Sequence, residues 1–195
     1  MPRHMDVYEA AIGRRTTRRF KQDAIGRETL EKLVNAARLA PSAMNLQPCE
    51  YVVVDDPRVA DEVFKTLRWA AYIAPEGDPK EGERPVAYIV VLLNRKKRET
   101  GGEVDAAAAI ENILLTAYGE GLGSCWLGSV DRERLSKVLR VPEHCRIDSV
   151  VALGYAAEKP VLEEMAESVR YWKDGEGVLH VPKRRLEDVI HFNVY

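Results

Sequence analysis

Residues 14–20 read Arg14-Arg15-Thr16-Thr17-Arg18-Arg19-Phe20, a run that places four guanidinium groups and two hydroxyl groups close together. Arginine presents a planar fork of N–H donors that can bind two oxygens of a phosphate or carboxylate at once. Hydroxyl and backbone N–H groups can bind the remaining lone pairs. The run is therefore typical of a site for a small anion. A basic cluster can also be solvated surface, so the choice between the two depends on the rest of the chain.

The composition favours one folded domain with a local anion site. The chain has 195 residues, of which 46% are hydrophobic, and this is enough for a packed core. No linker-like or low-complexity run divides it, so we expect a single domain over residues 1–195. The formal net charge of -2 argues against a general nucleic-acid-binding protein, which would need a broad basic face.

The cysteines and the apolar runs exclude further classes. Cys49, Cys125 and Cys145 are odd in number and widely spaced, so we expect neither a disulfide framework nor a metal site. No apolar run reaches the roughly 18 residues of a membrane span. The first residues carry charge instead of an apolar signal core. We therefore expect a cytoplasmic protein without a membrane segment.

Hydrophobic periodicity predicts alternating helices and strands. Helices are predicted over residues 6–13, 27–40, 57–69, 103–120 and 131–140, with a last short helix that contains Leu186, Val189 and Ile190. Strands are predicted over residues 51–54, 86–93 and 147–153. Residues 75–85 are rich in proline, glycine and charge, so they are predicted to form a mobile surface loop or lid.

This alternation, taken alone, would suggest a parallel doubly wound sheet. However, no Gly-x-Gly-x-x-Gly turn follows the first strand, and no Walker-type Gly-Lys-Ser or Gly-Lys-Thr occurs in the chain. The usual nucleotide-binding loops are therefore missing.

Four further motifs follow the arginine run in order. They are Pro41-Ser42-Ala43-Met44-Asn45-Leu46-Gln47-Pro48, Gly121-Leu122-Gly123-Ser124-Cys125-Trp126-Leu127-Gly128, Leu153-Gly154-Tyr155 and Pro182-Lys183-Arg184-Arg185-Leu186. Together with the arginine run, and across nearly the whole chain, they resemble the FMN-dependent nitroreductase family. The resemblance implies an α+β fold with three α/β/α layers, in which helices flank a mixed, mostly antiparallel sheet. It also implies an intertwined homodimer with two FMN sites at the subunit interface.

The same resemblance implies roles for the basic residues. Arg14, Arg15, Thr16 and Arg18 correspond to the loop that holds the FMN phosphate and ribityl chain. Lys183 and Arg185 correspond to a second basic clamp on that phosphate. The resemblance leaves Arg19 as a solvated side chain and Arg184 as one that faces away. A phosphate monoester with a charge near -2 gains from several charge-assisted hydrogen bonds, which agrees with this assignment.

Two other segments correspond to parts of the family that surround the flavin ring. Pro41, Ser42, Ala43 and Asn45 resemble the segment that the partner subunit lays beside the isoalloxazine ring, with Gln47 as a supporting polar group. Ala43 stands where many relatives have serine, so one hydroxyl contact is expected to be absent. Gly128 and Ser129 fall where the family places a backbone amide against flavin N5, and glycine there lets the main chain come close.

The remaining ring contacts are assigned to three residues. Trp126 and Leu127 would pack near the ring, although a tryptophan beside an apolar helix is more often part of the core. Relatives commonly place a lysine or arginine by flavin N1 and the C2 carbonyl. Arg68 is the candidate here, and the alternative is that it forms a surface ion pair.

The activity implied is that of an FMN-dependent NAD(P)H oxidoreductase. NADH or NADPH would pass hydride to flavin N5, and a nitroaromatic, a quinone or a similar flat acceptor would then take the electrons in a ping-pong cycle. This scheme needs no catalytic acid or base. We therefore interpret His4, His144, His180 and His191 as packing, capping or surface residues.

Three alternatives remain open at the level of sequence. A relative of reductive dehalogenase or flavin-destructase type would use the same flavin site for a narrower reaction. A non-catalytic FMN-binding protein would hold flavin without turnover, and a basic-loop interaction module would bind no flavin at all. Bleaching of bound flavin by NADH or NADPH, followed by reoxidation by an acceptor, distinguishes the oxidoreductase from the other classes.

Overall fold

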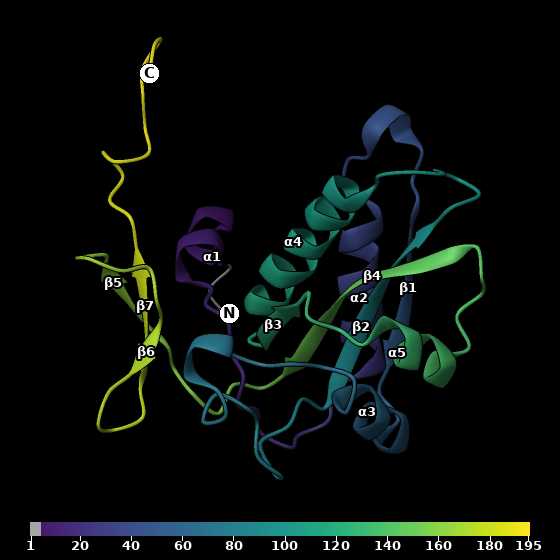
Figure 1. Cartoon of the computed structure of the whole chain (residues 1–195), viewed down its shortest axis with the longest axis horizontal. Helices are drawn as coiled ribbons and strands as arrows, with labels where there is room; N and C mark the ends of the chain where they lie inside the picture. Colours follow the sequence, from purple (N-terminus) through teal and green to yellow (C-terminus); the bar gives the residue numbers. More distant parts are fainter. Residues whose placement is uncertain (1–4) are drawn as a thin grey trace.

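The computed structural model describes residues 5–195 and places an antiparallel sheet at its centre (Figure 1). Within these residues the sheet has four strands in the order β1-β2-β4-β3. They are β1 (Cys49–Val54), β2 (Ala87–Asn94), β3 (Gly123–Leu127) and β4 (Cys145–Gly154). Every neighbouring pair in this sheet is antiparallel. The alternation of helices and strands alone would have suggested a parallel sheet, so the prediction from family resemblance is the correct one.

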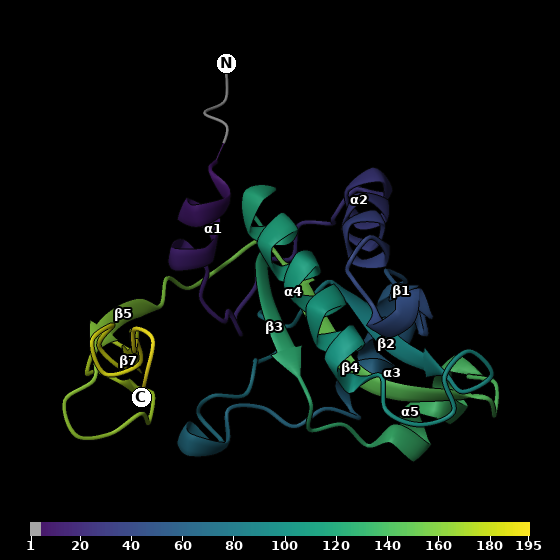
Figure 2. The same ribbon diagram turned by 90° about the horizontal axis from the view of Figure 1, so that it is seen from above.

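Helices cover both faces of the sheet. On one face lie α1 (Val7–Gly13), α2 (Arg27–Arg38) and α4 (Glu103–Gly119), with α1 packed along α4 (Figures 1 and 2). On the other face lie α3 (Pro57–Phe64) and α5 (Arg132–Leu139). The predicted three-layer α/β/α architecture is therefore confirmed.

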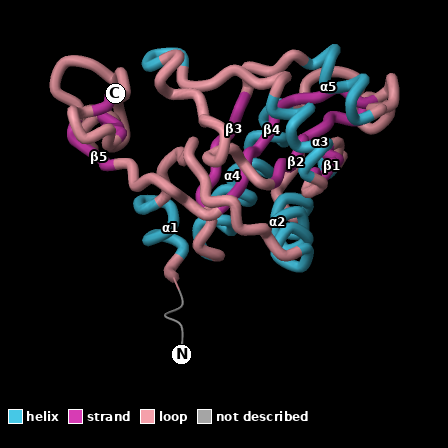
Figure 3. The backbone as a smooth tube through the Cα atoms, turned by 90° about the horizontal axis from the view of Figure 1, so that it is seen from below, coloured by secondary structure: helices cyan, strands magenta, loops and turns pink. Residues whose placement is uncertain are grey.

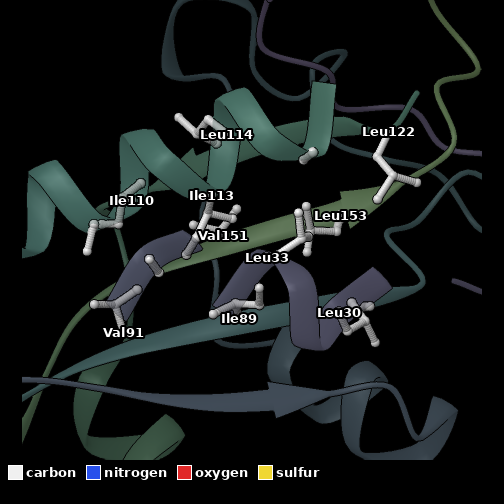
Figure 4. Packing of buried hydrophobic residues seen from close by; sticks show 14 of the residues in the cluster. Leu30, Leu33, Ile89, Val91, Ile110, Ile113, Leu114, Leu122, Val151 and Leu153 are labelled. Atoms are coloured by element: carbon white, nitrogen blue, oxygen red, sulfur yellow. The ribbon is translucent and has the colours of Figure 1, made fainter. Parts of the chain in front are cut away.

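The alternation of side chains along β2 divides the core between these two faces. Ile89, Val91 and Leu93 pack with the apolar residues of α2 and α4 (Figure 4). Tyr88, Val90 and Leu92 point the other way and pack with α3 and α5. Because all eight residues of β2 are buried, this strand has no solvent-facing side, as its continuous apolar sequence predicts.

Two boundaries differ from the sequence prediction around residues 64–70 and 123–129. Helix α3 ends at Phe64 instead of continuing to residue 69. The chain beyond it pairs with the segment after β3, where Asp131 N donates to Thr66 O at 2.8 Å. The stretch 124–129, for which no element was predicted, begins within strand β3.

The C-terminal part forms a small second sheet beside the main body (Figures 2 and 3). Its strands are β5 (Val161–Glu164), β6 (Trp172–Lys173) and β7 (Leu179–Lys183), in the order β5-β7-β6. Strand β5 is parallel to β7, and β6 is antiparallel to it. These strands escaped prediction because they are short, and β5 and β6 are also mostly solvent-facing.

The predicted last helix is wrong. The chain makes only a hydrogen-bonded turn there, in which Ile190 N donates to Leu186 O at 3.1 Å. Leu186, Val189 and Ile190 have helical spacing, but all three are exposed. A helix of this length needs tertiary packing of its apolar face, and here nothing in the described chain covers that face.

Residues 75–85 contain turns and bends but no helix or strand, as predicted, and their mobility stays a prediction. None of the helices in residues 5–195 is long and apolar enough to cross a membrane. All three cysteines are free thiols.

Candidate active site

Two paired glycines bring the arginine run onto the edge of the main sheet. Gly123 of β3 and Gly154 of β4 lie opposite each other. A Cβ atom on Gly123 would lie 2.8 Å from Thr17 Cγ2, and one on Gly154 would lie 2.8 Å from Phe20 Cδ1. Both facing side chains are buried. The glycines therefore leave the space into which Thr17 and Phe20 insert, and this anchors both ends of the segment between them.

Backbone hydrogen bonds hold the same run in place, and the Arg15 guanidinium also donates to two backbone carbonyl oxygens, those of Ile12 and Arg14. Thr17 N donates to Ser124 O at 2.9 Å. The carboxylate of Glu158 accepts from two successive amides, Arg18 N at 2.6 Å and Arg19 N at 3.2 Å. Sequence reasoning missed Glu158, because a single glutamate 140 residues away carries no local signal.

The arginine run and strand β7 enclose a cavity of about 670 Å³. The basic and hydroxyl residues on its wall are Arg14, Arg15, Thr16, Arg18, Lys183 and Arg184. Ala11, Val169, Tyr171, Val181 and Pro182 complete the wall. The two basic motifs, which lie at opposite ends of the sequence, therefore meet at one site.

The cavity presents cationic donors without matching anions. The Nε atoms of Arg14, Arg15 and Arg18 are buried and have no hydrogen-bond partner among the described residues. Burial, followed by repulsion from Arg14, lowers the pKa of the Arg15 guanidinium. The carboxylate paired with Arg14, that of Glu111, lies 3.9 Å from its Nε. The Arg14 and Arg18 side chains are only half-buried and line the cavity, so an anion that accepts from their exposed nitrogens would bind favourably.

The structure separates the three neighbouring basic residues at the end of β7. Lys183 and Arg184 line the cavity. Arg185 instead forms an ion pair with Glu164, with 2.6 Å between Nε and Oε1, and it does not line the cavity. The arrangement thus differs from the expected clamp of Lys183 with Arg185. Arg19 pairs with Glu83 at 3.5 Å.

The segment 41–48 lies on the other side of α4 from the arginine run (Figures 1 and 2). Its residues Pro41, Ser42 and Gln47 line a small cavity of about 100 Å³ beside Asp105 of α4. Ser42 Oγ accepts from Gln47 N at 3.0 Å, and Ala43 N donates to Asp105 Oδ1 at 3.1 Å.

The backbone of this segment is sharply turned. Asn45 and Gln47 both have positive φ, and Gln47 Nε2 donates to Asn45 O at 3.4 Å. Within one chain, these residues and the arginine cavity do not form a common site.

Arg68 and the Gly128–Ser129 pair, which are far apart in sequence, lie side by side. Arg68 N donates to Ser129 O at 3.1 Å. Arg68, Gly128 and Ser129 are exposed, whereas Leu127 is buried. No atom lies within 4 Å of a Cβ placed on Gly128, so open space lies over this backbone. Trp126 is 42% exposed and therefore is not a core residue.

The small sheet carries the only histidine with two carboxylate partners among the described residues. His180 Nδ1 lies 3.0 Å from Glu163 Oε2, and Nε2 lies 3.2 Å from Asp174 Oδ2. The Trp172 ring stacks on the imidazole at 4.3 Å. The hydrogen bond to Asp174, and then that to Glu163, raise the pKa of His180.

His180 on β7 therefore contacts Glu163 of β5, Trp172 of β6 and Asp174 directly after β6, so it joins the three strands of the small sheet. His4 lies outside the described residues. Within residues 5–195, no group of three or more His, Cys, Asp or Glu side chains is placed to hold a metal ion.

Comparison with known proteins identifies the family. The model of the nitroreductase family matches residues 11–155. A protein of Methanothermobacter thermautotrophicus, assigned as an NADH dehydrogenase/NAD(P)H nitroreductase, is 31% identical over 85% of this chain and 85% of its own length. An iodotyrosine deiodinase of Thermotoga neapolitana is 25% identical over 85% of this chain and 97% of its own length.

A solved structure supports the same conclusion. A Desulfovibrio desulfuricans protein assigned as a nitroreductase, crystallised in complex with FMN, superposes with a TM-score of 0.66 and 26% identity. It covers 84% of this chain, which in turn covers 93% of it. The fold and the matched residues define a three-layer α/β/α protein with a basic cavity beside its sheet edge. The chain belongs to the nitroreductase family.

The residues present fit two different parts of FMN. Unpartnered guanidinium donors and Lys183 suit a phosphate monoester. Open space over the Gly128 backbone suits the close approach of a flat ring.

Proposed function

We propose that this chain is an FMN-dependent NAD(P)H oxidoreductase that reduces nitroaromatics, quinones or similar flat electron acceptors as a homodimer. The enzyme class follows from membership of the nitroreductase family. When bound, FMN would accept hydride at N5 from NADH or NADPH and pass electrons on to the acceptor. The proposal goes beyond family membership in two respects: the class of electron acceptor and the homodimer. The single observation that carries the proposal is the cavity where two distant basic motifs meet around unpartnered arginine donors.

The arginine cavity binds the phosphate end of the cofactor. Arg14, Arg15, Arg18 and Lys183 donate to the phosphate oxygens, and Thr16 supplies a hydroxyl. Because Glu158 and Ser124 already fix the backbone of this run, little backbone entropy is lost when the guanidinium groups bind. Affinity therefore comes from preorganised cationic donors.

Gly128 and Ser129, which directly follow β3, hold the isoalloxazine ring of the cofactor. A backbone N–H at this point donates toward flavin N5, and the open space at Gly128 admits the ring. The exposed guanidinium of Arg68 lies beside the same strand end and supplies a positive charge for the N1 and C2 carbonyl edge. A fixed positive charge at that edge favours the negatively charged reduced cofactor.

The segment with Pro41, Ser42, Ala43, Asn45 and Gln47 comes from the second subunit. It lies across α4 from the arginine cavity of its own chain, so it reaches a flavin only if another chain presents it. The exposed apolar residues of the C-terminal tail also favour a partner. These residues are Leu186, Val189, Ile190, Phe192 and Val194.

The test is an absorbance spectrum of the purified protein after FMN addition and desalting, followed by anaerobic titration with NADH and NADPH. Menadione or a nitroaromatic is added last. We expect retained flavin that is bleached by at least one nucleotide and recovers on addition of the acceptor. The faster donor identifies the nicotinamide preference, and gel filtration of the same sample tests the dimer.

Matched variants localise the flavin. Arg18→Ala should lower FMN retention strongly, whereas Arg27→Ala should not, because Arg27 is exposed on α2 and pairs with Glu31 at 3.0 Å. Retained flavin that neither nucleotide reduces would favour a non-catalytic FMN-binding protein. Failure to retain any flavin would reject the assignment of the arginine run and favour a basic-loop interaction module.

A second candidate is a reductive dehalogenase of the same fold, which the similarity to the iodotyrosine deiodinase favours. The discriminating measurement is halide release from an iodinated phenol by the reduced protein, compared with turnover of menadione. Halide release that is faster than quinone turnover would support this second candidate. A flavin destructase would instead consume its own FMN under air.

A further inference from the structure

Arg132, the first residue of α5, links β3 to β4 through its side chain at the point where their backbone pairing stops. The pairing of the two strands ends at Leu127 of β3. Directly beyond it, Arg132 Nη2 donates to Gly128 O at 3.1 Å and to Asp148 O of β4 at 2.7 Å. Its Nε donates to Ile147 O of β4 at 3.1 Å. One guanidinium therefore binds three backbone carbonyl oxygens, for which the planar fork of arginine donors is well suited.

These bonds fix the direction of the peptide group between Gly128 and Ser129. Because a trans peptide is planar, its C=O and N–H point in opposite directions. The Ser129 N–H therefore points away from the guanidinium that binds Gly128 O. The next peptide group is held as well, since Ser129 O accepts from Arg68 N at 3.1 Å. The peptide groups on both sides of Ser129 are thus fixed by bonds to other segments.

Ser129 keeps its N–H available to a ligand. Within residues 5–195 this N–H makes no hydrogen bond. Gly128 and Ser129 are both exposed, and no atom lies within 4 Å of a Cβ placed on Gly128. An oriented backbone donor beside open space is suited to an acceptor atom on a ligand. Arg132 also strengthens this donor, because a charged group bound to the carbonyl oxygen polarises the same peptide.

Other contacts hold the chain around this peptide group without involving the Arg132 side chain. Asp131 N donates to Thr66 O at 2.8 Å, which continues the pairing with the segment after α3. The Asp131 side chain accepts from Arg134 N at 3.1 Å and so caps α5. Loss of the Arg132 guanidinium would therefore release Gly128 O and leave the cap and the pairing in place.

We propose that Arg132 is a positioning residue, which aims and polarises the Ser129 N–H toward N5 of the bound flavin without touching the cofactor itself. The inference rests on the proposed function, which assigns Gly128 and Ser129 to the flavin ring. A donor that is fixed before the reaction needs no reorganisation during it, so hydride transfer to N5 is faster. The affinity for FMN depends little on Arg132, because the phosphate donors line a different part of the site.

The test compares wild type with Arg132→Met in full-length protein loaded with FMN that carries ¹⁵N at N5. A hydrogen bond to N5 moves its NMR resonance to lower frequency, so loss of the aimed donor in Arg132→Met should move it to higher frequency. Anaerobic reduction by NADH or NADPH should slow about tenfold. FMN retention should change less than about twofold. Arg134→Met is the matched control from the same turn of α5, and it should behave as wild type because Arg134 pairs with Glu62 at 3.5 Å.

A second variant separates position from charge. Arg132→Lys keeps the positive charge but lacks the planar fork, so its N5 resonance and its rate should lie between those of wild type and Arg132→Met. Wild-type values in Arg132→Lys would overturn the proposal, since charge alone would then suffice. A lower melting temperature of Arg132→Met with an unchanged N5 resonance would also overturn it, because Arg132 would then have a purely structural role.

The free protein tests the contact to Gly128 O without flavin. The ¹⁵N resonance of the Ser129 amide should move in Arg132→Met and stay in place in Arg134→Met, because only Arg132 binds the carbonyl of that peptide group. An unmoved Ser129 resonance would reject the role of Arg132 and leave the proposed function intact. Wild type that retains no flavin would instead reject the proposed function, and with it the role of Arg132 toward N5.

Discussion

Arg68 donates its backbone N–H to the carbonyl oxygen of Ser129 at 3.1 Å, and this bond joins two segments that family resemblance assigns separately to the flavin ring. The bridge between Leu67 and Val130 and the bond from Asp131 N to Thr66 O extend the pairing on either side. Leu67 is buried and Arg68 is exposed, so the pairing fixes which side chain faces solvent. The Arg68 backbone is thus held beside the end of β3 by bonds that do not involve its exposed side chain.

Arg68→Ala should slow the reduction of bound flavin by about tenfold, since one positive charge at the developing anion is lost. FMN retention should change less than about twofold, because the phosphate donors are untouched. Stopped-flow bleaching with NADH or NADPH measures the first quantity, and retention after desalting measures the second. Arg134→Ala is the control, since Arg134 pairs with Glu62 on the outer face at 3.5 Å. Loss of flavin in proportion to loss of rate would contradict a role at the ring.

Gly123→Ala should lower the free energy of unfolding by about 1–3 kcal/mol, the usual range for overpacking. The new methyl group would lie 2.8 Å from Thr17 Cγ2, and Thr17 is only 4% exposed, so it has little room to move. Urea denaturation monitored by tryptophan fluorescence measures the change. Gly119→Ala is the matched control: no atom lies within 4 Å of its added Cβ, and alanine favours the helix. Equal stability of the two variants would refute the close packing of the arginine run on β3.

Helices and buried strands were predictable because the spacing of their apolar residues indicates which surface must be buried. The long apolar pattern of α4 and the continuous apolar run of β2 both correspond to enclosed elements. The direction of the strands was not predictable in this way. Alternating helices and strands are compatible with a parallel or an antiparallel sheet, and only the resemblance to a family indicated the antiparallel arrangement.

The missed features depend on contacts between distant segments. Strand β3 is short and glycine-bounded, and it is defined by pairing with β4. Leu186, Val189 and Ile190 have helical spacing without a surface to cover, which is why spacing alone misled. Within the site, the arginine run was found from its composition. Arg184 faces the cavity and Arg185 does not, because of the direction that the chain takes after β7. Two adjacent arginines look alike in the sequence, so it could not show which of them lines the cavity.

The stability of the small sheet should depend on pH through His180. The folded-state pKa of His180 is raised by its bonds to Asp174 and Glu163, so folding favours the protonated ring. This contribution is complete below the unfolded pKa of about 6.5 and is lost as pH rises through the higher folded pKa. Amide-exchange protection factors of β7 should therefore fall as the pH rises above about 6.5. His180→Gln should remove the trend, and His144→Gln should retain it. A flat profile in wild type would show that the imidazole does not couple to the sheet.

Arg184→Ala and Arg185→Ala should differ in their effect on FMN binding, although the residues are neighbours of the same type. Arg184 lines the cavity that holds Arg14 and Arg18, so its loss should weaken FMN affinity by about tenfold, the value of one charge-assisted hydrogen bond. Arg185 is 2.6 Å from Glu164, and an exposed ion pair contributes little, so its loss should change affinity less than about twofold. Quenching of flavin fluorescence on titration measures both. The reverse order would support the clamp of Lys183 with Arg185 that family resemblance predicts, and it would mean that β7 turns its last residues differently when FMN is bound. Equal losses in both variants would instead indicate a general effect of positive charge, without a specific contact to the phosphate.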